Sequence, residues 1–271
     1  MLSWLKRKAR IYGAFAANTV KLNLAYSIWF WVDFFGQILM MMILVYFWRA
    51  VYSNTANVGG MDADATITYI LFAQMVAPLV RWSWILDFGF WIREGQIAIE
   101  LTRPVDFQGK AYVEWLTSTC VLLLRQSAPL FLIAWLCFGL KVPTDPRIWG
   151  SFVVSLVLGN AVMFLFDWTY GQLAFYTTEV WGLHVLREGV ATFFSGSLIP
   201  LVMLPGWLQK VAAAMPFGQT LNTPVSLLAG ITPVEQAPHI WFVQSLWVLG
   251  LFVVARVAFM VASRKVTVQG G

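Results

Sequence analysis

Residues 24–48 read LAYSIWFWVDFFGQILMMMILVYFW, a stretch in which Asp33 is the only charged side chain. An α-helix crosses a bilayer core of about 30 Å with roughly 20 apolar residues. Trp29 and Trp48 lie at the ends of the stretch, and tryptophan favours the membrane–water interface. Because a backbone in lipid must satisfy its own hydrogen bonds, this stretch predicts a transmembrane helix.

Five further apolar runs meet the same length requirement, so the sequence predicts six transmembrane helices. The composition agrees, because 11% of the residues are charged against about 25% in soluble domains. Gly189, Gly196 and Pro200 interrupt the fifth run. We predict an all-α integral membrane protein with a single six-span membrane domain over residues 23–271. The later runs lie near 66–88, 112–139, 148–176, 183–203 and 239–262.

The positive charges between these runs predict the orientation of the chain. An even number of spans places both termini on one side, and Lys and Arg favour the cytoplasmic side. A cytoplasmic N-terminus leaves only Arg49, Lys141, Arg147 and Lys210 outside. The inner segments then hold Lys6, Arg7, Lys8, Arg10, Lys21, Arg93, Arg103, Lys110, Arg187, Arg264 and Lys265. We therefore predict a multi-pass plasma-membrane protein with both termini in the cytoplasm.

Residues 1–22 form a separate region with an amphipathic pattern. Apolar and small side chains recur there every three or four residues, and basic side chains lie elsewhere around the helix. This pattern predicts a helix lying in the cytoplasmic membrane interface. The alternative is a basic flank that only orients the first span. In either case the basic cluster near the N-terminus indicates a membrane surface as its partner and not a nucleic acid.

The segment between the second and third runs is longer than a simple turn requires. Its sequence REGQIAIELTRPV covers residues 93–105, and Ile92, Gln96, Ile99 and Arg103 follow a helical spacing. Pro104 ends that helix. A short cytoplasmic helix with charges of both signs is suited to docking into a groove on a partner, and the alternative is a helix lying passively on the inner leaflet.

A second unusual segment, residues 204–238, follows the fifth run. Its prolines each remove a backbone donor and tend to end helices. We predict two short apolar helices that meet at Pro216–Gly218. They would dip into the outer leaflet while packed against protein, because irregular backbone is not tolerated in contact with lipid.

The sequence lacks the common catalytic signatures. It contains no G-x-x-x-x-G-K-[ST], H-E-x-x-H or G-x-S-x-G motif. Cys120 and Cys137 are about 25 Å apart along one predicted helix, which is too far for a disulfide. His184 and Glu188 share a helical face, but two side chains make a weak case for a metal site. We expect no catalytic residue, metal or cofactor in this chain.

Charged residues inside the predicted spans are candidates for function. A charge at the centre of a membrane helix costs about 2.5–3.5 kcal/mol on insertion scales. Arg81, Arg125 and Asp167 lie deepest in the predicted spans. They are expected to form ion pairs between helices, or, for the two arginines, to line a pathway for an anionic substrate.

Three segments give the chain a resemblance to the type-2 permeases of ATP-binding-cassette (ABC) exporters. The first is the basic amphipathic start. The second is a G-x5-L-x-x-P pattern formed by Gly95, Leu101 and Pro104. The most specific is FFSGSLIPLVMLPGWLQKVAAAMPF, residues 193–217. The residues LTRP at 101–104 resemble a branch in which two different permeases often accompany one ATPase.

The resemblance implies that membrane passage and ATP hydrolysis are carried out by different subunits. Residues 93–104 would be a coupling helix seated in a separate nucleotide-binding ATPase, present in two copies, which would bind ATP and Mg²⁺. A second permease, identical or homologous, would complete the exporter, and a prokaryotic membrane is implied. Hydrophobic or amphipathic substrates are expected, such as lipids, glycolipids, peptides or drugs. The implied coupling residues are Arg93, Glu94, Gly95, Glu100, Leu101, Arg103 and Pro104, and the implied outer lid contains Pro200, Pro205, Trp207, Pro216 and Phe217.

Three other functions fit the sequence less well. A secondary transporter driven by an ion gradient usually shows internal repeats and buried acid or histidine relays, which are absent here. A membrane-embedded enzyme would need paired catalytic groups. A passive anchor would need neither a shaped inner helix nor a proline-rich outer segment.

Overall fold

The computed structural model describes residues 2–25, 27–80, 83–177 and 179–265. Within these ranges every regular element is a helix, apart from an isolated bridge between Val58 and Met61. This confirms the predicted all-α class. The α-helices are α1 (Leu2–Ala25), α2 (Ser27–Tyr52), α3 (Ala63–Val80), α4 (Trp84–Arg93), α5 (Gln96–Thr102), α6 (Phe107–Leu122), α7 (Ala128–Phe138), α8 (Pro146–Gly171), α9 (Trp181–Phe194), α10 (Gly206–Ala213), α11 (Phe217–Thr220), α12 (Asn222–Leu228) and α13 (Ala237–Ser263). Shorter helical turns are η1 (Leu123–Ser127), η2 (Gln172–Phe175), η3 (Leu201–Met203) and η4 (Val234–Gln236).

Five helical segments of the described chain are long and apolar enough to cross a membrane. They correspond to the first, second, third, fourth and sixth runs of the sequence. Four of them join more than one helical element: α3 with α4, α6 with η1 and α7, α8 with η2, and η4 with α13. Their bounds are Phe30–Tyr52, Ala63–Arg93, Phe107–Phe138, Pro146–Phe175 and Val234–Ser263.

Helix α3 occupies the centre of the bundle, and its residues from Tyr69 to Ala77 are all buried. Pro78 lies inside this helix and has no N–H, so the carbonyl of Gln74 loses its helical partner. The Gln37 amide of α2 donates to that carbonyl at 2.9 Å. The Ser127 hydroxyl of η1 donates to the Met75 carbonyl at 2.7 Å. Neighbouring helices therefore supply the hydrogen bonds that a proline inside a membrane helix requires.

Helix α8 packs closely against the short helices that precede α13. A side chain at Gly159 would place its Cβ atom 2.7 Å from the Gln219 carbonyl oxygen, so only glycine permits this approach. Ser151 and Ser155 continue the same stripe and are buried. Small residues at intervals of four allow membrane helices to approach closely. This stripe lets α8 pack against α11 and α13 of the same chain.

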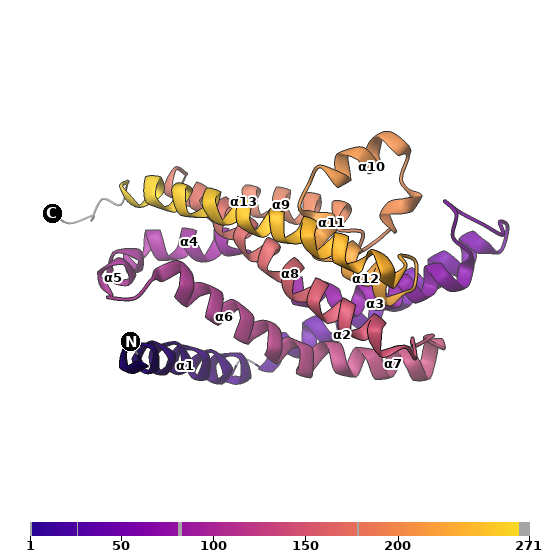
Figure 1. Cartoon of the computed structure of the whole chain (residues 1–271), viewed down its shortest axis with the longest axis horizontal. Coiled ribbons are helices and arrows are strands. Elements are labelled where there is room, and N and C mark those ends of the chain that lie inside the picture. Colours follow the sequence, from indigo (N-terminus) through magenta and orange to yellow (C-terminus); the bar gives the residue numbers. More distant parts are fainter. Residues whose placement is uncertain (1, 26, 81–82, 178, 266–271) are drawn as a thin grey trace.

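The molecule is elongated, with distinct features at its two ends (Figure 1). The start of α1, helix α5 and the end of α13 lie at one end, which we call the α5 end. The connection between α2 and α3, the start of α8, and helix α10 lie at the other, which we call the α10 end. Arg256 of α13 contacts Asp106 beside α5, and Lys265 lies over Tyr176 just after α8. Helices α8 and α13 therefore run in the same direction.

The fifth predicted run differs most from the structure. It forms α9, whose 14 residues are about 21 Å long, and the described structure does not confirm six continuous spans. Gly196 follows in a left-handed conformation with φ of 81°. The Tyr69 hydroxyl donates to the Gly196 carbonyl at 2.9 Å, and the Gln74 amide donates to the Ser197 carbonyl at 2.9 Å. Because α3 supplies these donors, the helix can stop where the sequence predicts that it continues.

The predictions for the N-terminal helix and for the segment between α9 and α13 also change in detail. Helix α1 extends to Ala25 and packs along α6, where Thr19 is buried and the Asn23 amide donates to the Ser118 hydroxyl at 3.1 Å. Between α9 and α13 the structure has three short helices, α10, α11 and α12, where the sequence predicts two. Pro216 immediately precedes α11, near the predicted break.

Candidate functional site

Helix α5 is a short linker helix at the α5 end of the molecule (Figure 1). Helix α4 ends at Arg93, and Gly95 turns the chain with a left-handed φ of 69°. Residues other than glycine rarely adopt this conformation. Ile97 is buried and anchors the helix, whereas Ile99 is 60% exposed and Leu101 is also exposed. Ile99 and Leu101 are two residues apart, so these exposed apolar side chains point to different sides of α5.

A charged network connects α5 to the start of α6. The Lys110 ammonium donates to Glu100 of α5 at 2.7 Å and lies 3.8 Å from Glu114, one turn further along α6. Arg103 also pairs with Glu100, at 3.2 Å. The Lys110 side chain is buried and its ammonium lies 5.2 Å from the centre of the Phe15 ring in α1. Lys110 of α6 therefore contacts both α5 and α1.

Asp106 fixes the first turn of α6 and joins it to α13. Its carboxylate accepts a hydrogen bond from the Gly109 backbone N–H at 2.7 Å, which is the N-cap arrangement. The same carboxylate binds the Arg256 guanidinium in a two-pronged pair, at 2.6 and 2.9 Å. The hydrogen bonds from Arg256 lower the pKa of Asp106, so this pair is ionised at neutral pH.

A large cleft lies beside this network, between α2 and the helices α3, α4 and α6. Its volume is about 1160 Å³, which slightly exceeds the usual 300–1,000 Å³ of small-molecule pockets. Phe30, Trp84, Trp91 and Trp115 contribute aromatic surface to its wall, and about half of the lining residues are polar or charged. The charged lining residues are Asp33, Asp87, Lys110, Glu114 and Arg125.

Arg125 lies on η1, a π-helical turn in the middle of the third span. Such turns insert one extra residue into a helix and are frequent at functional sites. The Arg125 guanidinium lies over the Phe30 ring at 4.1 Å and donates to the Asn23 carbonyl at 2.5 Å. The arginine therefore holds the junction of α1 and α2 against α6, with its side chain only partly buried.

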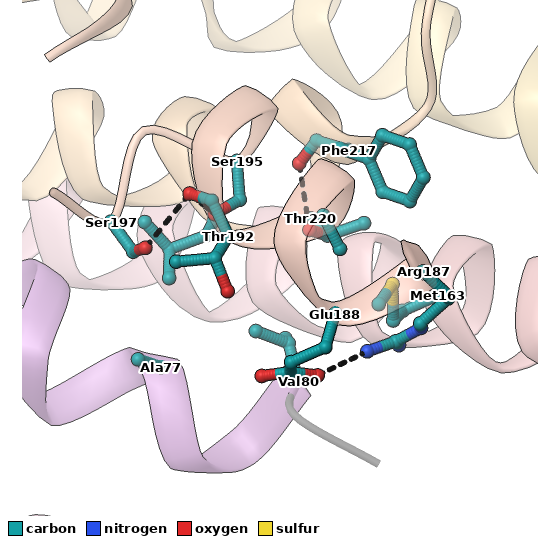
Figure 2. A pocket seen from close by; sticks show the side chains of 12 residues that line it. Ala77, Val80, Met163, Arg187, Glu188, Thr192, Ser195, Ser197, Phe217 and Thr220 are labelled. Atoms are coloured by element: carbon teal, nitrogen blue, oxygen red, sulfur yellow. Dashed lines mark hydrogen bonds and ion pairs between the residues drawn. The ribbon is translucent and has the colours of Figure 1, made fainter. Parts of the chain in front are cut away.

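Asp167 and Arg187 form a fully buried ion pair between α8 and α9. The Arg187 Nε donates to Asp167 at 2.7 Å, and both side chains are about 1% exposed. Glu188 accepts a further hydrogen bond from Arg187 at 2.9 Å. Figure 2 shows Arg187 and Glu188 beside a small cavity of about 30 Å³. That cavity has room for a water molecule and is too small for a transported substrate.

The structure places the predicted site residues in several different regions. Arg93 and Glu94 end α4 and do not belong to α5, whereas Glu100 and Leu101 lie within it. Arg103 and Pro104 follow α5 directly. Arg81 lies outside the described residues. Arg125 lines the cleft. Asp167 lies elsewhere, in the buried ion pair with Arg187.

The predicted outer-lid residues flank the short helices at the α10 end. Pro200 and Pro205 precede η3 and α10, and Trp207 on α10 is 68% exposed. Phe217 is buried, and its ring centre lies 4.8 Å from that of Phe166 in α8. Among the described residues no group of His, Cys, Asp and Glu has the arrangement of a metal site.

Sequence reasoning missed Lys110, Asp106 and Arg187 as site residues. A signal for Asp106 was present, because an aspartate just before an apolar run is a common helix N-cap. Arg187 was placed among the inner cytoplasmic charges, but its side chain is buried against α8. No periodicity in the sequence indicates that Lys110 contacts the preceding helix.

The described residues thus form a helical bundle with five segments able to cross a membrane, a lateral cleft and a short linker helix. A family model described as ABC-2 family transporter protein matches residues 38–270. The chain belongs to this family, as the resemblance predicted. ABC-2 permeases generally act with ATPase subunits. Comparison with curated proteins and with solved structures gave no match.

Proposed function

We propose that this chain is the permease subunit of an ATP-driven exporter and that α5 is its coupling helix. The observation that supports this most directly is the Glu100–Lys110 contact at 2.7 Å. It gives α5 a rigid connection to a membrane-crossing helix, which a helix resting passively on lipid would not need. Hydrolysis of ATP with Mg²⁺ would take place in a separate subunit, because the sequence has no P-loop.

The proposed assembly contains two ATPase subunits and a second permease, identical or homologous to this chain. The α5 end would face the cytoplasm of a prokaryotic cell, together with both termini. The α9 segment and the residues after it would provide the sixth crossing. Substrates would be hydrophobic or amphipathic, because the wall of the cleft is rich in aromatic side chains.

The exposed side chain of Ile99 on α5 supplies the test. The chain is purified together with any ABC ATPase encoded beside its gene, with and without the substitution Ile99→Glu. We expect the substitution to abolish co-purification and stimulated ATP hydrolysis, because it places a charge in the proposed docking face. The matched control is Val202→Glu, which alters a 46% exposed apolar residue at the α10 end and is expected to leave both readouts unchanged.

Two results would overturn the proposal. One is full co-purification and ATPase stimulation with Ile99→Glu in a correctly folded protein. The other is transport by reconstituted vesicles that carry an ion gradient and contain neither ATPase nor nucleotide, which is the behaviour of a secondary transporter.

A further inference from the structure

One face of α2 lines the cleft with a polar and aromatic pattern. Phe30, Asp33, Gln37 and Met40 all line it and follow a spacing of three, four and three residues. This spacing places them on one side of a helix. Gln37 is buried and bonded to Gln74, whereas Asp33 is exposed. The cleft is therefore accessible at the surface of the bundle along the Asp33 side of α2.

Asp33 and Arg125 both line this cleft but do not pair with one another. Asp33 has no hydrogen bond or ion pair with any residue that the structure describes. Arg125 uses one nitrogen for the Asn23 carbonyl, and its other N–H donors have no described partner. A charge inside a membrane segment costs about 2.5–3.5 kcal/mol on insertion scales and is normally kept for a function.

Part of the remaining wall suits an apolar chain, although the lining also contains Asp87 and the paired Lys110 and Glu114. Trp84, Trp91 and Trp115 contribute aromatic surface, and Val121 and Leu122 contribute aliphatic surface. Burial of apolar surface contributes about 25 cal/mol per Å², so this wall favours a hydrophobic tail. The polar group of such a molecule would then lie near Asp33 and Arg125.

We propose that the cleft binds a zwitterionic amphiphile of the phospholipid type, with its phosphate at Arg125 and its ammonium group at Asp33. This inference rests on the proposed function and specifies its substrate class. A purely anionic headgroup would leave the Asp33 carboxylate without a partner and would be repelled by it. A purely cationic headgroup would leave the free donors of Arg125 unused and would be repelled by the guanidinium.

Three lipids with the same two octanoyl chains test the headgroup preference. They are dioctanoyl phosphatidylethanolamine, dioctanoyl phosphatidylglycerol and a dioctanoyl trimethylammonium propane. Binding to the purified full-length protein is measured by native mass spectrometry. We expect the zwitterionic lipid to bind about tenfold more tightly than either of the others, as expected for one additional charge-assisted hydrogen bond.

Substitutions assign each charge to its proposed partner. Asp33→Asn is expected to weaken phosphatidylethanolamine binding by about tenfold and to leave phosphatidylglycerol binding unchanged or stronger. Arg125→Gln is expected to weaken the binding of both phosphate-bearing lipids. Since Arg125 also supports the junction of α1 and α2, its variant is interpreted only if its thermal unfolding is close to that of the unaltered protein.

Gly36 offers a test that does not alter a charge. It lines the cleft, and a Cβ atom added there meets no atom within 4 Å. Gly36→Phe is expected to fill the cleft and abolish binding without loss of stability, because glycine is a poor helix former. Gly250→Phe in α13 is the matched control, since that glycine is equally open, is not among the cleft-lining residues, and its substitution is expected to leave binding intact.

Equal binding of the three lipids, or unchanged binding in Gly36→Phe, would overturn the proposal. So would a photo-crosslinker at position 36 that captures a second permease in the assembled complex, since that face would then be a subunit contact. These outcomes differ from failure of the proposed function, which would appear as loss of ATPase co-purification in the unaltered protein.

Discussion

At the scale of single residues, the Asp167–Arg187 pair is the most costly arrangement in the molecule. Two charges that are about 1% exposed have lost their hydration, and their mutual contact, together with the hydrogen bond from Arg187 to Glu188, offsets part of that loss. Removing one partner leaves an uncompensated buried charge. We expect Arg187→Leu to reduce stability by about 3–5 kcal/mol, measured as a lowered thermal unfolding midpoint in detergent.

A double substitution separates charge burial from lost packing. Asp167→Leu combined with Arg187→Leu is expected to recover much of the loss, because replacing a buried ion pair with apolar groups is often neutral. Arg147→Leu is the surface control. The Arg147 side chain, which pairs with Asp145, is 75% exposed, and exposed ion pairs contribute little to stability. Equal losses in the single and double variants would show that the charge pair is not the source of the effect.

At the scale of elements, the connection between α5 and α6 depends on Lys110. Lys110→Met keeps the length and apolar stem of the side chain but removes the contact to Glu100. We expect the complex with the ATPase still to form, because the exposed face of α5 is intact, while stimulation of ATP hydrolysis falls at least about tenfold if one charge-assisted hydrogen bond transmits the motion.

The conservative variant and a distant control make this prediction specific. Lys110→Arg keeps a positive charge within reach of Glu100 and is expected to restore stimulation. Lys141→Met removes an exposed pair with Asp64 and is expected to have no effect. If Lys110→Met instead prevented complex formation, the lysine would be needed to shape the docking face and not to transmit movement.

The elements also show which structural features the sequence could predict. Long apolar runs predicted five of the crossing segments. The bilayer sets the length and composition of such a segment, so each can be recognised from its own residues. The break after α9 was not predictable. It depends on Tyr69 and Gln74, which lie more than a hundred residues earlier and supply the donors that make irregular backbone tolerable.

The candidate site was predictable only in part for the same reason. Pro104 indicated where α5 ends, because turn conformations depend on local residue type, whereas the predicted helix ran through Gly95, where the structure separates α4 from α5. Lys110 was counted among the charges of the inner loop, and only tertiary packing brings it against Glu100 and Phe15. Asp33 and Arg125 could be recognised as costly charges, but their shared cleft required the arrangement of α2 against η1.

At the scale of the whole molecule, parallel packing of α8 and α13 constrains the topology. Both helices run from the α10 end to the α5 end, so the chain between them must return through α9 and the residues that follow (Figure 1). A short helix and an irregular segment can make this passage because α3 satisfies their backbone groups. The α5 and α10 ends should therefore face opposite sides of the membrane.

Single cysteines introduced at Ile99 and Trp207 test this topology in a background where Cys120 and Cys137 are replaced by serine. We expect an impermeant maleimide to label position 207 in intact cells and position 99 only in inverted vesicles, because the inner side carries the excess of Lys and Arg. Both side chains are well exposed in the isolated chain, and the chain is expressed without the ATPase, so that docking does not cover position 99 and failure to label reflects the membrane barrier. Labelling of both positions from one side would mean that α9 and its following residues do not cross, and that α5 and α10 share a compartment.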